Sequence, residues 1–294
     1  IYKTISAWYV RVEALKERLI AANQQVHWVP NHLKDGRFGK WLEGAHDWNI
    51  SRSRYWGNPL PIWRNEDTGE AVCIGSRDEL QELSGVAVDD LHKHIVDEVV
   101  IPSPTGQGDL RRIPEVLDCW FESGSMPYGQ AHYPFDDKKA FEAGYPADFI
   151  CEALDQTRGW FYTLLVLSTA LFDKPAFNNV VVSGLVLAED GRKMSKSLKN
   201  YPEPNELVNK FGADAIRIYL LDSPVLRGEE TRFSQNGVRE MVRRVLLPWW
   251  NSVCFLQTYA AVDGWDPETD AWDAEPTHEL DVWIGSKLEG LKAQ

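Results

Sequence analysis

Cysteine is scarce in this sequence, and long hydrophobic runs are missing. The four cysteines lie far apart and form no Cys-x-x-Cys pair, so buried, reduced thiols are favoured over a metal site. No apolar run reaches the length that spans a bilayer, and no signal peptide opens the chain. These absences predict a cytoplasmic protein without a membrane partner. The cysteines are Cys73, Cys119, Cys151 and Cys254.

Positive charge is also in short supply. The net charge of −13 argues against a protein that binds nucleic acid with its whole surface. An initiator Met is missing at Ile1, from which we expect a fragment or a processed product. A local basic path stays possible, and these side chains are available for it: Arg52, Arg54, Arg111, Arg112, Lys193, Lys196, Lys199, Arg239, Arg243 and Arg244.

A short basic loop between residues 187 and 200 carries the clearest chemistry. The β-branched run Val180–Leu187 predicts a buried strand, and Asp190-Gly191 predicts a turn after it. Lysines offer mobile charges to phosphate oxygens, and Ser hydroxyls and loop amides add donors. The pattern therefore indicates a polyphosphate clamp, with a solvated basic loop as the alternative. The loop reads Lys193-Met194-Ser195-Lys196-Ser197.

Lys-Met-Ser-Lys-Ser resembles the second signature of the class I aminoacyl-tRNA synthetases, whose loop holds the triphosphate of ATP. The resemblance implies that Lys193 and Lys196 are catalytic and neutralise the leaving pyrophosphate, with Mg²⁺ bridging the phosphate oxygens. The ATP-binding set that it implies is Gly184, Lys193, Met194, Ser195, Lys196 and Ser197.

Three further segments resemble the same family in the same order. The segment Asp47–Pro61 reads Asp-Trp-Asn-Ile-Ser-Arg-x-Arg-x-Trp-Gly-x-Pro-x-Pro, which alone would be an ordinary cation–π and core cluster. The segment Leu117–Gly124 resembles the motif Trp-Phe-Asp/Glu-Ser-Gly, with a Gly turn. The run Glu152–Phe161, Glu-Ala-Leu-Asp-Gln-Thr-Arg-Gly-Trp-Phe, is most similar to isoleucyl-tRNA synthetases.

That last run lies between a predicted strand at 147–151 and a predicted helix at 157–172, where an open α/β sheet binds ligands. Taken alone, Asp155 would be a helix N-cap and Trp120 a core residue. The family has Gly where this chain has Ala153. The resemblance implies that Glu152, Asp155 and Gln156 face the aminoacyl-adenylate and that Trp120 and Trp160 line the amino-acid pocket.

Elsewhere the patterns predict a helix at 6–23, a loop-rich connection at 24–41, a strand at 60–63 and a short helix at 79–84. Two helices at 204–210 and 213–221, a long helix at 238–259, an acidic connection at 263–278 and a helix at 281–291 follow. The fold class expected is α/β, part of a Rossmann-like parallel sheet with flanking helices followed by an α-helical segment.

The resemblance also implies a division of the chain. We expect a connection and core segment at 1–64, a small subdomain of unassigned chemistry at 65–116, and the second half of the catalytic core at 117–200. A stem-contact helical region at 201–237 and the start of a helical anticodon-binding domain at 238–294 complete it.

The activity implied is ATP-dependent activation of isoleucine and its transfer to the 3′ end of tRNA(Ile). Neither a His-x-Gly-His signature nor an editing domain is found. We therefore expect a fragment that needs the missing N-terminal half of the enzyme as its partner and is inactive alone. Valyl- or leucyl-type specificity, a non-catalytic tRNA-binding module and a generic nucleotide-binding α/β domain are the alternatives.

Overall fold

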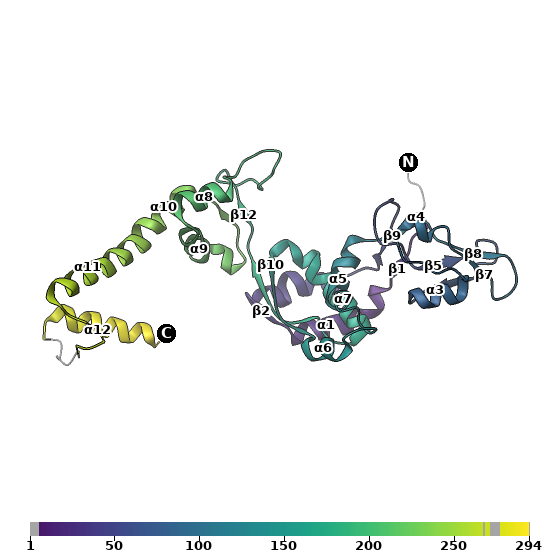
Figure 1. Cartoon of the computed structure of the whole chain (residues 1–294), viewed down its shortest axis with the longest axis horizontal. Coiled ribbons are helices and arrows are strands. Elements are labelled where there is room, and N and C mark those ends of the chain that lie inside the picture. The colour runs from purple at the N-terminus through teal and green to yellow at the C-terminus, as the bar shows by residue number, and fades with distance from the viewer. Residues whose placement is uncertain (1–5, 267, 271–276, 294) are drawn as a thin grey trace. The chain divides into compact units, whose positions relative to one another are not determined.

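The computed structural model describes residues 6–266, 268–270 and 277–293 of the chain (Figure 1). Contacts divide the chain into two units. The first unit contains residues 1–201 and 220–233, and the second contains residues 202–219 and 234–294. No helix within the described residues is long and apolar enough to cross a membrane.

A parallel three-stranded sheet forms the centre of the first unit, in the order β10–β11–β2. The middle strand carries the first half of the predicted β-branched run, residues 180–183, and branched side chains pack well on a pleated surface. The second half of that run leaves this sheet at Gly184 and forms a separate short strand at Val186–Leu187. Val180 pairs with Ile150 on one side and with Trp28 on the other. The strands are β10 (Ala147–Ala153), β11 (Phe177–Ser183) and β2 (His27–Val29).

Two helices, α1 (Lys16–Gln25) and α7 (Trp160–Phe172), pack with this sheet around the main core. The rings of Trp28 and Phe161 pack edge to face within that core, with their centroids 6.2 Å apart. The indole Nε1 of Trp28 donates to Asn23 Oδ1 at 2.9 Å, so its buried polar atom is paired. Alternate side chains of the strands point to the opposite face of the sheet, where Phe149 is 64% exposed.

A subdomain built on an antiparallel sheet of order β6–β5–β8–β7 holds a second core. Trp63, 2% exposed, donates from Nε1 to the carbonyl of Val99 at 2.8 Å. The short helix predicted at 79–84 is confirmed here, within α3. Its elements are β5 (Ile62–Arg64), β6 (Ala71–Cys73), α3 (Arg77–Ser84), α4 (Lys93–Val96), β7 (Val100–Pro102) and β8 (Asp109–Arg112).

Short strand pairs and helices complete the first unit. Three of its pairs are β1–β3, β4–β9 and the parallel pair β12–β13. The elements are β1 (Tyr9–Val10), η1 (Val12–Leu15), η2 (Lys34–Phe38), α2 (Gly39–Glu43), β3 (Trp48–Asn49), β4 (Ser51–Arg52), β9 (Val116–Leu117), α5 (Cys119–Gly129), α6 (Lys138–Gly144), η3 (Leu154–Arg158), β12 (Val186–Leu187), η4 (Pro224–Arg227) and β13 (Thr231–Arg232).

The second unit is helical, as predicted. The helices at 204–210 and 213–221 are confirmed, and the long helix predicted at 238–259 is one continuous run that includes a π-helical turn. The connection at 263–278 lies partly outside the described residues. The elements are α8 (Pro204–Phe211), α9 (Ala213–Leu221), α10 (Gln235–Met241), η5 (Val242–Leu246), α11 (Leu247–Asp263) and α12 (Glu279–Lys292).

Sequence predictions for two segments and for the burial of the cysteines are wrong. The helix predicted at 6–23 begins instead as β1, because Tyr9 and Val10 pair with Asn49 and Trp48. The stretch 24–41, predicted to be loop-rich, contains β2, which forms through pairing with β11. The cysteines are free but not buried: three are exposed and Cys254 is half-buried. The five-part domain division stays a prediction.

Candidate active site

Two predicted segments begin from neighbouring strand ends. Ala153 at the end of β10 is paired in register with Ser183 at the end of β11. Residues 152–160, here called the strand-end corner, continue from β10, and Gly184 follows β11 directly. The carboxyl edge of a parallel sheet is where open α/β folds bind ligands. The strand-end corner and the segment that leads to Lys193 and Lys196 therefore leave the sheet at the same edge.

Within the strand-end corner, Trp120, Gln156 and Trp160 are brought together around Gly159. The Oε1 atom of Gln156 accepts from the backbone N–H of Trp160 at 3.0 Å. A β carbon on Gly159 would lie 2.7 Å from that Oε1 atom and 3.0 Å from the ring of Trp120. Only glycine lets both side chains close on this point. Trp120 is 40% exposed, so it is not the core residue that its composition alone favours.

The orientation of Trp160 is fixed from a second direction. Its indole Nε1 donates to the carbonyl of Ser123 at 3.0 Å. Ser123 belongs to α5, which packs closely on α7 because Gly124 faces Thr163 there; a β carbon on Gly124 would lie 3.0 Å from that residue. The sequence predicts a turn at Gly124, but this residue lies within α5. The glycine is needed for helix contact rather than for a bend.

The two acidic residues of the strand-end corner are accessible. Glu152 and Asp155 are exposed, and among the described residues neither side-chain carboxylate has a hydrogen bond or an ion pair. The stand-alone interpretation of Asp155 as a helix N-cap is wrong. Asp155 lies inside η3, and the residue before α7 is Gly159, without a side-chain cap. Two unpaired carboxylates therefore stand where the parallel strands end.

Arg37 supports the strand-end corner, although no sequence pattern indicates it. Its Nε atom donates to Thr157 Oγ1 at 3.0 Å, and the Thr157 hydroxyl donates to the Leu154 carbonyl at 2.7 Å. Thr157 is fully buried. These bonds tie η3 to η2, a segment more than a hundred residues earlier in the chain. Thr157 lies in the run Glu152–Phe161, but Arg37 is recognisable only from the fold.

The segment Asp47–Pro61 is joined to α5 through a buried carboxylate. Asp118 accepts from the Trp48 indole Nε1 at 3.1 Å and forms an ion pair with Arg52 at 3.0 Å. Asp118 is only 4% exposed. Arg52 is therefore held by this ion pair, although the sequence offers it for a basic path. The contact fixes the helix that carries Trp120.

Residues 188–200, here called the lysine loop, begin as a hairpin. Lys193 forms an isolated bridge with Leu187 of β12, and Gly191 adopts φ +83° in the turn predicted from the sequence. Asp190 accepts from Arg192 Nε at 2.7 Å and from its backbone N–H at 2.9 Å. These hydrogen bonds, helped by the charge of Arg192, lower the pKa of the Asp190 carboxyl.

Asn200 closes the far end of the lysine loop. Its Oδ1 atom accepts from the Ser195 N–H at 2.9 Å, and its Nδ2 donates to the Lys193 carbonyl at 3.2 Å. Ser195 and Ser197 share a hydroxyl hydrogen bond of 2.8 Å. Lys193 and Lys196 are exposed, and among the described residues neither forms an ion pair. The loop thus presents two unneutralised cations beside Ser hydroxyls.

Gly184 has a structural reason to be glycine. A β carbon there would lie 1.7 Å from the Glu229 carbonyl oxygen, so the backbones of the two segments are in direct contact. The Gly184 N–H also donates to the Val225 carbonyl at 2.7 Å. This crossing places residues 225–229 against the end of β11. β13 then pairs with β12 at the base of the lysine loop.

A family model described as class I tRNA synthetases (I, L, M and V) matches residues 1–232. The chain belongs to this class I synthetase family. It is 60% identical over 293 residues to the isoleucine–tRNA ligase of Bdellovibrio bacteriovorus, in an alignment that covers 100% of this chain and 28% of that protein. It is 54% identical over 304 aligned residues to the isoleucine–tRNA ligase of Treponema denticola, again covering 28% of the relative.

Solved structures of class I synthetases share the fold. The LeuRS of Agrobacterium radiobacter, in a ternary complex with tRNA and LeuAMS, superposes with a TM-score of 0.51 at 23% identity, over 76% of this chain and 31% of that one. The Mycobacterium tuberculosis methionyl-tRNA synthetase bound to methionyl-adenylate gives 0.53 at 20% identity, over 82% and 38%. The predicted α/β class and the resemblance to isoleucyl-tRNA synthetases are confirmed. This class I synthetase chain spans about 28% of the length of the curated relatives it matches.

Proposed function

We propose that this chain is the part of an isoleucine–tRNA ligase that holds the nucleotide and part of the amino-acid pocket. The whole enzyme would activate isoleucine with ATP and transfer it to the 3′ end of tRNA(Ile). The observation that carries the proposal is identity of 54–60% to isoleucine–tRNA ligases along the whole chain. The arrangement of the strand-end corner supports it, because the run Glu152–Phe161 supplies both a wall and free carboxylates.

In this proposal, the lysine loop holds the triphosphate. The carboxylate of isoleucine attacks the α-phosphorus, the bond to the bridging oxygen breaks, and pyrophosphate leaves. Lys193 and Lys196 neutralise the charge that develops on the leaving group, and Ser195 and Ser197 donate hydrogen bonds. Met194 and Gly184 complete the predicted nucleotide contacts. Gly184 would act through its position at the end of β11 rather than through a side chain.

The strand-end corner would hold the other end of the nucleotide. Gln156, which already bonds the Trp160 amide, presents its remaining amide group, while Glu152 and Asp155 offer acceptors for hydroxyl and ammonium groups of the adenylate. Trp120 and Trp160 provide rigid apolar walls for a branched aliphatic side chain. Such a pocket discriminates one methylene only weakly, and isoleucyl-tRNA synthetases are themselves the familiar example of that limit.

Mg²⁺ is proposed to arrive with ATP. Among the described residues, no group of three or more His, Cys, Asp and Glu side chains is placed to hold a metal ion. The lysine loop offers cations and hydroxyls, which suit phosphate oxygens rather than a metal. When bound, the ion would add positive charge at the phosphates. The chain's own residues would bind and orient the substrate.

Two partners complete the proposal. The side of the parallel sheet that carries Phe149 is open, whereas parallel sheets are ordinarily covered on both faces. We propose that the N-terminal half of the catalytic domain covers it and that the chain alone is inactive.

For tRNA(Ile), the exposed arginines Arg239, Arg243 and Arg244 of the second unit are candidates for contact, although Arg243 and Arg244 share Glu240 as a partner. The cytoplasmic location stays a prediction.

ATP–pyrophosphate exchange tests this proposal. The N-terminal part of a close isoleucine–tRNA ligase is added to the chain, and exchange is measured with isoleucine and with valine. Exchange that needs both polypeptides and prefers isoleucine supports the proposal. Preference for valine would assign the valyl type, and exchange by the chain alone would show that the missing half is unnecessary.

A further inference from the structure

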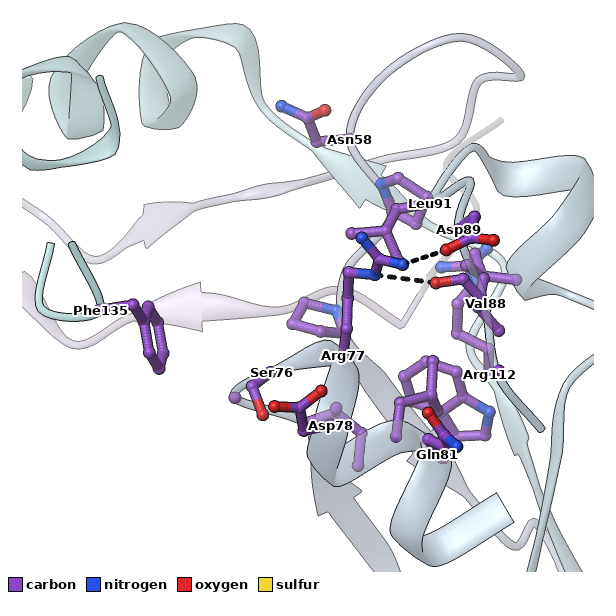
Figure 2. Close-up of a pocket in the computed structure, with 18 of the residues that line it drawn as sticks. Asn58, Ser76, Arg77, Asp78, Gln81, Val88, Asp89, Leu91, Arg112 and Phe135 are labelled. Carbon is purple, nitrogen blue, oxygen red and sulfur yellow. Dashed lines mark hydrogen bonds and ion pairs between the residues drawn. The ribbon is translucent and has the colours of Figure 1, made fainter. Parts of the chain in front are cut away.

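A cavity of about 770 Å³ opens beside α3, and none of the residues predicted to bind ATP, the aminoacyl-adenylate or the amino-acid side chain lines it. Its walls are the residues before and within α3, the 58–61 segment, the 87–91 loop, and His132 and Phe135 from beyond α5 (Figure 2). This volume is in the range of ligand pockets and exceeds that of one side chain. The subdomain to which most of these residues belong has no role in the proposed chemistry.

The cavity has an apolar floor and apolar groups at its mouth. Leu80 and Val88 are buried at its base, while Leu91 is 49% exposed and Phe135 is 61% exposed. Figure 2 shows Phe135 across the opening from Ser76 and Asp78. Exposed apolar groups gathered around a concavity are a feature of interaction sites, since a partner removes them from water.

The positive charges of the cavity are already neutralised. Arg77 donates from Nε to the Val88 carbonyl at 2.8 Å and forms an ion pair with Asp89. The Arg112 guanidinium is fully buried and forms an ion pair with Asp97. The Asp78 carboxylate, in contrast, has neither a hydrogen bond nor an ion pair among the described residues. The accessible net charge of the lining is therefore negative.

The surrounding surface has the same sign. Residues 56–112 hold eleven Asp and Glu against five Lys and Arg, a net charge of −6 within a chain of −13. A phosphate backbone would be repelled by this surface, because nucleic-acid sites concentrate Lys and Arg. A partner with basic groups would be attracted to it and would also find the apolar walls.

We propose that this cavity docks a peptide segment of a partner protein in which apolar side chains are flanked by Lys or Arg. An apolar side chain fills the space between Leu91 and Phe135, and a neighbouring ammonium or guanidinium group meets Asp78. The site is separate from the proposed nucleotide site, so the proposal stands whether or not the chain takes part in isoleucine activation.

Fluorescence anisotropy with a labelled probe peptide, acetyl-Gly-Lys-Leu-Phe-Lys-Arg-Gly-amide, tests the proposal on the whole chain. The same peptide with Glu at its basic positions, and a single-stranded oligonucleotide of eight thymidines, are the other probes. The basic peptide is expected to bind more weakly as salt rises, and the two other probes are expected not to bind. Tighter binding of the oligonucleotide would overturn the proposal in favour of a nucleic-acid surface.

Substitutions locate the binding. Phe135→Ala is expected to weaken binding of the basic peptide about tenfold, because apolar contact is lost. Asp78→Asn is expected to weaken it about two- to fivefold and to flatten its salt dependence. Leu171→Ala, at a side chain that is 59% exposed elsewhere in the first unit, is the matched control and should change nothing. Equal affinity for all variants, or no measurable affinity with circular dichroism unchanged, contradicts the proposal.

Discussion

The α-carbon of Gly184 faces the Glu229 carbonyl so closely that a β carbon would lie 1.7 Å from its oxygen. This contact joins the end of β11 to the segment that returns to pair with the base of the lysine loop. Because the obstacle is backbone, it cannot rotate away as a flexible side chain would.

We therefore expect Gly184→Ala to lower the free energy of unfolding of the first unit by about 1–3 kcal/mol, the usual effect of overpacking. Urea unfolding followed by tryptophan fluorescence measures it. Gly129→Ala is the control, since nothing lies within 4 Å of its β-carbon position. Equal stability of the two variants would show that the backbone contact between Gly184 and Glu229 can accommodate a β carbon without cost.

Asn200 is predicted to hold the lysine loop closed. Asn200→Ala removes the acceptor of the Ser195 N–H and the donor to the Lys193 carbonyl. Loss of these two hydrogen bonds, each worth about 1 kcal/mol, should speed amide exchange at residues 193–200 about thirtyfold, with β11 unchanged. Hydrogen exchange with mass spectrometry measures this. Asn200→Asp keeps an acceptor and should show a smaller effect; identical exchange in all three proteins would rule out the closure.

The fold is predictable where local chemistry and tertiary structure agree. β11 is recognisable because Val180, Val181 and Val182 favour a strand in any buried setting. The turn at Asp190-Gly191 is recognisable because it needs a positive φ, which Gly191 adopts. β2 is not recognisable, because three residues before a proline carry no periodic signal. It is a strand only because its partner β11 lies beside it.

The candidate site is partly predictable for a similar reason. Trp120, Gln156 and Trp160 stand in recognisable runs, so the sequence can name them as a group. Their arrangement around Gly159 depends on the packing of α5 on α7, which spacing along the chain does not encode. Arg37 and Asn200 contribute single hydrogen-bonding side chains from loops or short helices, where one polar residue resembles any other.

Buried Tyr162 and half-buried Tyr128 should make the protein sensitive to alkali. Burial raises the pKa of Tyr162 to about 12 from 10.0, with a smaller contribution from Asp47, and burial likewise raises the pKa of Tyr128 to about 12. Between pH 10 and about pH 12, the phenols of both tyrosines lose their protons in the unfolded chain but keep them in the folded chain. The stability they contribute is therefore complete below pH 10 and is lost as pH rises through about 12.

Unfolding free energy measured across this alkaline range checks the prediction. Tyr162→Phe should make the decline less steep, because one of the phenols whose pKa is raised by burial is gone, while Tyr128 and Tyr145 remain. Tyr9→Phe, at a side chain that is 58% exposed, is the control and should follow the unaltered protein. If the decline is the same with and without Tyr162, its phenol does not carry the alkaline sensitivity.

Lys196 is predicted to act on the leaving pyrophosphate. In the enzyme completed by its N-terminal half, Lys196→Ala should lower the rate of pyrophosphate exchange by about 10²–10³-fold, by analogy with removal of one oxyanion donor. Lys193→Ala should act in the same direction. Lys40→Ala, an exposed lysine without an ion pair among the described residues, is the matched control. Exchange that survives both loop substitutions would remove the lysines from the mechanism.

The central claim is that the lysine loop and the strand-end corner hold opposite ends of one nucleotide. The position of the ligand in a crystal structure of the completed enzyme with an isoleucyl-adenylate analogue and pyrophosphate tests it most directly. The account predicts pyrophosphate against Lys193 and Lys196, with the isoleucyl group between Trp120 and Trp160. A bound adenylate that touches neither Gln156 nor Asp155, or a lysine loop remote from the pyrophosphate, would contradict it.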